Sequence, residues 1–111
     1  MKERDVSRYL NKRVKELGGE IRRVTWQGRR NAPDKLVMLE GRSFFVEEKR
    51  PDEHATPAQR REHKRLRDAG LEVRVVSDYY TVEAALSDSE DDLDDFERAD
   101  GPRWYPPPEH Y

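Results

Sequence analysis

Residues 31–50, NAPDKLVMLEGRSFFVEEKR, contain two short runs of strand-forming residues separated by Glu40 and Gly41. A two-residue Glu-Gly connection between alternating or apolar runs is typical of a tight β-hairpin turn. In such a hairpin the numbers of paired residues sum to 81, so Asp34 lies directly opposite Glu47. The sequence therefore predicts a hairpin with two acidic residues facing each other at its open end.

This pair of carboxylates indicates a metal site. Directly opposed Cβ atoms lie about 4.5 to 5.5 Å apart, which lets two carboxylates share one cation such as Mg²⁺ or Mn²⁺. Lys49 points to the same face as Glu47, because strand side chains alternate, and its ammonium can orient a metal-bound water. In the alternative interpretation, Asp34 caps a turn after Pro33, while Glu47 and Lys49 are solvated residues of an edge strand. A three-residue loop would also turn Asp34 to the other face.

The same residues resemble a known nuclease signature. Pro33-Asp34 followed by Glu47-Glu48-Lys49 is similar to the PD-(D/E)xK motif. The context narrows the resemblance to the virus-type replication-repair nuclease (VRR-NUC) family, through an N-terminal helix bearing Glu3, a glycine-containing loop before Pro33, and the run Thr56-Pro-Ala-Gln59. The similarity covers about residues 1–86.

The resemblance implies roles for three further residues. Glu3 would bind a second metal or orient water, although a first-turn acid also complements the helix dipole. Gln59 would lie near the scissile phosphate, although it also completes a T-x-x-Q capping box with Thr56, and we expect it to fill one role at a time. Glu48 would contact the metal through its backbone carbonyl, and its side chain is expected to pair with Lys35 across the hairpin.

Charge divides the chain into two parts. Hydrophobic residues make up 33% of the 111 residues and charged residues 41%. Residues 1–86 carry 20 Lys and Arg against 15 Asp and Glu, whereas residues 87–111 carry 2 against 9. This asymmetry indicates a basic nucleic-acid-binding domain followed by an acidic, proline-containing tail that is expected to be disordered. The tail is expected either to mask the DNA surface or to bind a protein partner.

Basic residues near the predicted site are candidates for DNA contacts. The loop before Asp34 contains a glycine and two arginines, and guanidinium groups suit phosphate. The following helix is rich in Lys and Arg, although a solvated charged helix is the alternative. The predicted DNA-binding residues are Gln27, Arg29, Arg30, Arg60 and Lys64.

Other compositional features exclude several classes of protein. The chain has no cysteine, which excludes disulfides and thiolate zinc sites. Its three histidines, His54, His63 and His110, show no metal-ligand spacing and are expected at the surface. No apolar run is long enough to cross a membrane, so we expect a cytoplasmic protein, in the host bacterium if the viral resemblance holds.

The full pattern predicts the order α-β-β-β-α-β-α. Helices are expected over residues 2–17 and 56–69, with strands over 20–26 and 71–76 on either side of the hairpin. The first strand should have a bulge near residues 22–23, and Leu66 and Ala69 should form the thin apolar face of the second helix. The expected fold is α/β, a restriction-endonuclease-like αβββαβ core with a mixed four-stranded sheet flanked by helices and a disordered acidic C-terminal tail.

These features predict a metal-dependent, structure-selective DNA endonuclease. The resemblance implies a small homodimer that acts on four-way junctions or other branched DNA. A non-catalytic nucleic-acid-binding or assembly module that retains the nuclease fold is the alternative from another class, and a ribonuclease or modification-dependent restriction module is a third.

Overall fold

The computed structural model describes residues 2–87 and contains one mixed sheet with three helices. Its elements are α1 (Glu3–Glu16), β1 (Glu20–Arg23), β2 (Lys35–Leu39), β3 (Arg42–Glu48), α2 (Pro57–Asp68), β4 (Val73–Val76) and α3 (Tyr79–Leu86). The strand order is β1-β2-β3-β4, antiparallel except for the parallel pair β3 and β4. The predicted fold class is confirmed. The acidic tail lies outside the described residues.

The hairpin of β2 and β3 has the predicted register. Leu39 pairs with Arg42 and Lys35 with Val46, so every pair sums to 81. Gly41 has a φ of 75°, a left-handed conformation that the tight turn requires and that glycine adopts without steric cost. The parity that brings Asp34 and Glu47 to the same face is therefore present.

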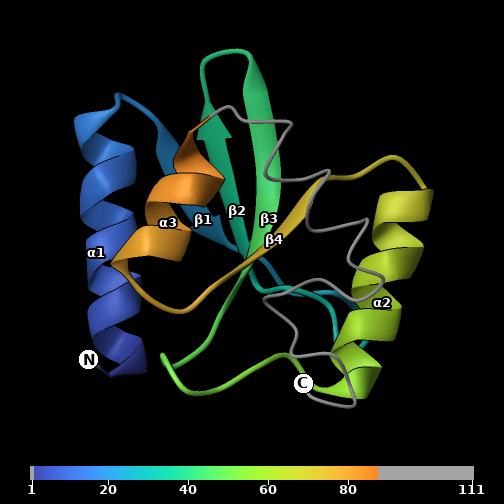
Figure 1. Cartoon of the computed structure of the whole chain (residues 1–111). Helices are drawn as coiled ribbons and strands as arrows, with labels where there is room; N and C mark the ends of the chain where they lie inside the picture. The colour runs from blue at the N-terminus through green and yellow to red at the C-terminus, as the bar shows by residue number, and fades with distance from the viewer. Residues whose placement is uncertain (1, 88–111) are drawn as a thin grey trace.

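The helices cover both faces of the sheet (Figure 1). Helices α1 and α3 lie on one face, and α2 lies on the other. The face under α1 and α3 holds the main hydrophobic core, in which strand and helix residues are almost fully buried; its members include Val6, Leu10, Val37, Phe44, Val46 and Val82. Alternation along β3 then directs Phe45, Glu47 and Lys49 toward α2.

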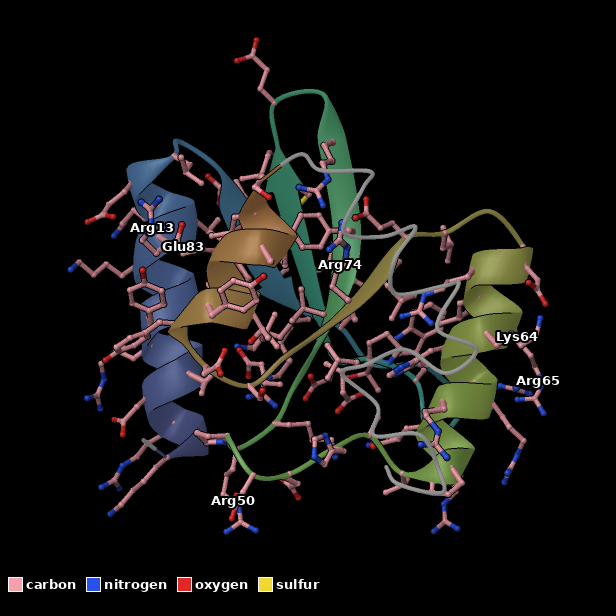
Figure 2. All side chains as sticks on the ribbon, viewed as in Figure 1. Arg13, Arg50, Lys64, Arg65, Arg74 and Glu83 are labelled. Carbon is pink, nitrogen blue, oxygen red and sulfur yellow. The ribbon has the colours of Figure 1, made fainter. Side chains whose placement is uncertain are left out.

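An ion-pair network joins α1 to α3. Nε of Arg13 donates to Oε2 of Glu83 at 2.6 Å, and the Tyr9 hydroxyl donates to the same oxygen at 2.6 Å. Figure 2 shows the Arg13 and Glu83 side chains meeting between the two helices. This network lies outside the apolar core and fixes α3 beside α1.

The connection from α1 to β1 depends on a close backbone approach. A Cβ atom on Gly19 would lie 2.6 Å from the carbonyl oxygen of Met38 and 2.7 Å from Cδ2 of Leu39. Because real Cβ atoms do not approach so closely, only glycine lets α1 end directly against β2.

Strand β1 is shorter than the sequence predicted, and it has no bulge. Its register with β2 is regular from Glu20 to Arg23. The Val24 N–H still donates to the Asp34 carbonyl at 2.9 Å. The residue before Asp34 is Pro33, which has no N–H to continue the ladder. Trp26 instead donates its indole N–H to the Pro33 carbonyl at 2.6 Å, so the chain leaves the sheet there.

Helix α2 turns a polar side toward the sheet. Glu62 and His63 are its buried residues, so the predicted apolar face is wrong for Ala69, which is exposed, while Leu66 is half-buried. Asp78 caps α3, and its apolar residues Val82, Ala85 and Leu86 are buried. No helix within residues 2–87 is both long enough and apolar enough to span a membrane.

Candidate active site

Glu47 occupies a nearly closed polar site between β3 and α2. Its side chain is 13% exposed. Oε2 accepts a long hydrogen bond of 3.5 Å from Nε2 of Gln59, and Oε1 lies 3.5 Å from Nε2 of His63. Oε1 is buried, and no hydrogen bond of ordinary geometry reaches it from residues 2–87. A buried carboxylate oxygen without a donor costs free energy, so a cation or a hydrogen-bond donor bound at this site would be stabilising.

Gln59 uses both ends of its amide at once. Its Oε1 accepts from the Thr56 N–H at 2.9 Å, while the Gln59 N–H donates to Oγ1 of Thr56 at 3.1 Å, which completes the predicted capping box. Its Nε2 remains available to reach Glu47. Capping requires only the amide oxygen, so it leaves the amide nitrogen available to the site, and a role of Gln59 near the scissile phosphate stays a prediction.

His63 is a site residue that the sequence reasoning placed incorrectly. It is fully buried rather than at the surface, whereas His54 is exposed as predicted and His110 lies outside the described residues. Burial lowers the pKa of His63 below its ordinary value although the Glu47 carboxylate opposes that shift, so the imidazole is neutral at neutral pH. The spacing of Gln59, His63 and Leu66 on one helical stripe was the available signal.

Asp34 lies at the mouth of this site. It directly precedes Lys35, whose partner across the hairpin is Val46, so Asp34 and Glu47 are the next residues outward on the two strands. Its side chain is 51% exposed and lies 3.9 Å from Nη1 of Arg23. Asp34 is thus an accessible carboxylate beside the buried one of Glu47.

Lys49 and Glu48 extend the two faces of β3. Lys49 is buried on the Glu47 side, and its N–H donates to the Val76 carbonyl at 2.9 Å. On the opposite side, Glu48 accepts from Nζ of Lys35 at 3.1 Å, which confirms the predicted ion pair, and Ser7 accepts from the same ammonium at 3.1 Å. Burial raises the pKa of Glu48, and the Lys35 charge opposes that shift. A metal contact by the Glu48 carbonyl stays a prediction.

The donor set fits a hard divalent cation. Among the side chains that the structure describes, which do not include that of Glu3, no three acidic, histidine or cysteine residues group closely enough to hold a metal by themselves. Mg²⁺ does not need such a cage, because one or two carboxylates, waters and substrate phosphate oxygens complete its shell. The buried Oε1 of Glu47 and the accessible Asp34 match that requirement.

The predicted DNA-binding residues fall into two groups. Arg29 is tied to α2, because its guanidinium donates twice to the buried Glu62 carboxylate, which also accepts from Arg65 at 3.0 Å. Arg29 is the main cause that lowers the pKa of Glu62. Arg30 and Gln27 are exposed, Arg60 is half-buried and Lys64 is exposed. Glu3 is the first residue of α1, but its side chain lies outside the described part of the structure.

The fold and this acidic hairpin end define a nuclease of the PD-(D/E)xK class. A protein named "Putative nuclease p44" from Acyrthosiphon pisum secondary endosymbiont phage 1 is 40% identical over 77 residues, which cover 68% of this chain and 83% of the relative. A solved structure of a VRR_NUC domain superposes with a TM-score of 0.68 at 36% identity, over 78% of this chain and 95% of that one. No family model matches the sequence. The chain belongs to the VRR-NUC family.

Proposed function

We propose that this nuclease is a Mg²⁺- or Mn²⁺-dependent DNA endonuclease whose active site is the open end of the β2–β3 hairpin. The buried Oε1 of Glu47, which no ordinary hydrogen bond reaches from residues 2–87, carries the proposal. A nuclease that buries a charged oxygen in this way needs a cation to offset the cost of its desolvation.

Asp34 and Glu47 would hold the metal, with the Glu48 carbonyl as a third oxygen donor. A cation held there would supply Lewis-acid chemistry, since it would make a water more acidic and offset charge on the phosphoryl group. Lys49, on the same side of β3, orients the attacking water or stabilises charge on the phosphate. In the hydrolysis a water oxygen bonds to phosphorus and releases a proton to solvent, the bond to the leaving oxygen breaks, and that oxygen takes up a proton from solvent.

Gln59 and His63 act on Glu47 from α2. Their nitrogen atoms lie 3.5 Å from the two carboxylate oxygens, so the helix limits the rotation of that carboxylate. Because His63 is neutral, it does not compete with a cation for Glu47 by charge. Glu3 and Gln59 remain candidates for direct contact with water or the scissile phosphate.

The proposed substrate is branched DNA, with four-way junctions preferred, cut by a homodimer. One chain has a single site of this kind within residues 2–87, and two-fold symmetry would present two sites to two opposed strands. Arg30, Gln27, Arg60 and Lys64 are proposed phosphate contacts. The acidic residues 87–111, which lie outside the described residues, would compete with DNA for the basic domain or bind a protein partner. The phage relative supports action in the cytoplasm of an infected bacterium.

Cleavage assays on matched substrates test this function. Four-way junction, flap, single-stranded and linear duplex DNA are incubated with Mn²⁺ or with EDTA, using the wild type, Asp34→Asn and Glu47→Gln. We expect metal-dependent, symmetric nicks in the junction by the wild type, and loss of cleavage with retained binding in calcium for both variants. Metal-independent cleavage, or full activity in either variant, would refute the metal site.

Oligomeric state is tested separately. Light scattering with and without a junction should give a dimer, and mapping of the nicks on each strand should show paired positions. A monomer that trims flaps or ends would overturn the junction assignment while leaving the metal site intact.

A further inference from the structure

A basic groove lies on the α1 side of the hairpin end, opposite α2. It is open and encloses about 660 Å³ between the first half of α1, the end of β1 and the end of β3. Four cationic side chains line it, those of Lys2, Arg4, Arg8 and Arg23. None of these residues was among the predicted DNA contacts.

The groove has an excess of positive charge that the surrounding residues do not neutralise. Among the lining residues whose side chains the structure describes, which do not include Glu3, Glu48 is the single acid, and that carboxylate is already bound to the buried Lys35 at 3.1 Å. Arg8 lies 3.8 Å from Asp5 and Arg23 lies 3.9 Å from Asp34, both at the long limit for ion pairs. Their side chains are 77% and 76% exposed, so each guanidinium retains donors that face solvent.

The position of the groove connects it to the candidate active site. Arg23 reaches both the groove and the Asp34 carboxylate, and Glu48 directly follows Glu47 in β3. Helix α1 begins at the edge of the molecule along which the chain runs from β3 to α2 (Figure 1). A strand lying in the groove would therefore reach the metal site from the Asp34 side.

On the α2 side, two of the cations are held by acidic side chains. Arg29 is bound to the buried Glu62, and Nζ of Lys64 lies 2.9 Å from Asp68. Figure 2 shows the Lys64 and Arg65 side chains directed outward from α2. The groove also has neutral hydrogen-bonding groups, Ser7 and Asn11, between its cations. Cations interleaved with neutral polar groups suit a chain of phosphates and sugars better than a single anion.

We propose that this groove binds the sugar–phosphate backbone of the DNA substrate beside the scissile phosphate, with Arg4 and Arg8 as its main phosphate contacts. The two arginines are one helical turn apart and line the same groove, so they can engage neighbouring phosphates. This inference rests on the proposed function for the identity of the ligand.

Salt-dependent binding provides the test. Affinity of the full chain for a fluorescent four-way junction and for linear duplex DNA is measured by anisotropy in EDTA, from low to moderate salt, so that cleavage does not enter the result. The variant is Arg4→Ala with Arg8→Ala. The matched control is Lys12→Ala with Lys15→Ala, which removes the same charge from exposed residues of the same helix outside the groove.

Two lost phosphate contacts should lower the magnitude of the slope of log affinity against log salt by about 1.8, at about 0.9 per contact on duplex DNA. At about 0.1 M salt we expect roughly tenfold weaker binding or more for the groove variant. The control should stay within about twofold, since charges outside the contact release few counterions. Thermal melting of both variants checks that each is folded.

A scan with single neutral methylphosphonates locates the contact. Wild-type affinity should fall at the phosphates that the groove holds, and the groove variant should be insensitive at those same positions. Three results would each contradict binding of DNA in the groove. They are an equal loss of affinity in the groove variant and the control, an unchanged salt slope in the groove variant, and identical methylphosphonate profiles for the wild type and the groove variant. An active Glu47→Gln enzyme would instead overturn the proposed metal site, so the two failures are distinguishable.

Discussion

The main apolar core lies on the sheet face under α1 and α3, whereas the face under α2 combines the buried apolar residues Val73 and Val75 with a polar site. Under α1 and α3, side chains such as Leu10, Phe44 and Val46 form a continuous apolar core. Under α2, the same strand presents Glu47 to Gln59 and to a fully buried histidine. Burying polar groups with long or missing hydrogen bonds costs about 1 to 3 kcal/mol each. The comparison indicates that the apolar core stabilises the fold, whereas burial of the Glu47 carboxylate on the other face lowers the free energy of unfolding.

The largest expected effect is on cleavage by Glu47→Gln. The substitution keeps the side-chain volume and removes the metal-binding charge, so we expect at least about a thousandfold loss of kcat/KM, or about 4 kcal/mol of transition-state stabilisation. The melting temperature should not fall, because a costly buried charge is removed. Glu40→Gln, an exposed acid at the other end of the hairpin, is the control and should keep full activity.

On the apolar face, Leu10→Ala should affect stability alone. Leu10 is fully buried, and such truncations cost about 2 to 5 kcal/mol of the free energy of unfolding. Denaturant titration measures the loss, and kcat should be unchanged where the variant is folded. Leu17→Ala, near the end of the same helix and half exposed, should change stability little. A loss of kcat in folded Leu10→Ala would show that the two faces are coupled.

His63→Leu separates the role of the histidine ring nitrogen from its volume. The leucine fills the buried position without the nitrogen beside Glu47, so we expect cleavage to fall about 10- to 100-fold while the protein stays folded. The exposed His54→Ala variant is the control. Wild-type activity in folded His63→Leu would make His63 a packing residue only.

Gln59→Glu separates the two ends of the Gln59 amide. A glutamate retains the acceptor that caps α2, but it places a second carboxylate against Glu47. We expect near wild-type melting with about tenfold slower cleavage, since positioning partners act on this scale. Gln59→Ala should lower both, with about 1 kcal/mol lost from the cap. Wild-type activity in Gln59→Glu would leave the amide nitrogen without a role.

The smallest expected effect is the acid sensitivity conferred by Glu62. Arg29 lowers the pKa of Glu62 below its ordinary value of 4.5. A lowered pKa contributes stability above pH 4.5, and that contribution is lost as the pH falls through the folded-state pKa. Unfolding free energies measured between about pH 3 and 6 should therefore depend less on pH in Glu62→Gln than in the wild type. Arg29→Gln should remove the larger part of that dependence, since Arg65 also lowers the pKa of Glu62, and adding Arg29→Gln to Glu62→Gln should change nothing further.

Local sequence patterns were sufficient for the hairpin. The Glu40-Gly41 turn fixed the parity, which in turn placed Asp34 opposite Glu47 and paired Lys35 with Glu48. These contacts depend on a few neighbouring residues and on the alternation of strand side chains. The bounds of the other elements were also close, apart from β1, where the absence of an N–H on Pro33 ends the ladder early.

The docking of α2 could not be predicted in the same way. Most of its residues are charged, so hydrophobic periodicity gave no clear inward side and favoured Leu66 and Ala69. Tertiary contacts determine the rotation of α2 about its own axis instead. Arg29 from a distant loop binds Glu62, and Gln59 and His63 lie 3.5 Å from Glu47. A polar helix face that docks on a polar site has no apolar pattern to reveal it.

The pairing of β3 has a consequence for the order of folding. Its antiparallel contact with β2 closes through two residues, whereas its parallel contact with β4 forms only after α2 has crossed the sheet. Short loops close at little entropic cost, and long-range pairings form late. We therefore expect Asp34 and Glu47 to come together early in an exposed hairpin. The nascent chain would bury Glu47 only at the final step, so its active site would be the last part of the enzyme to mature.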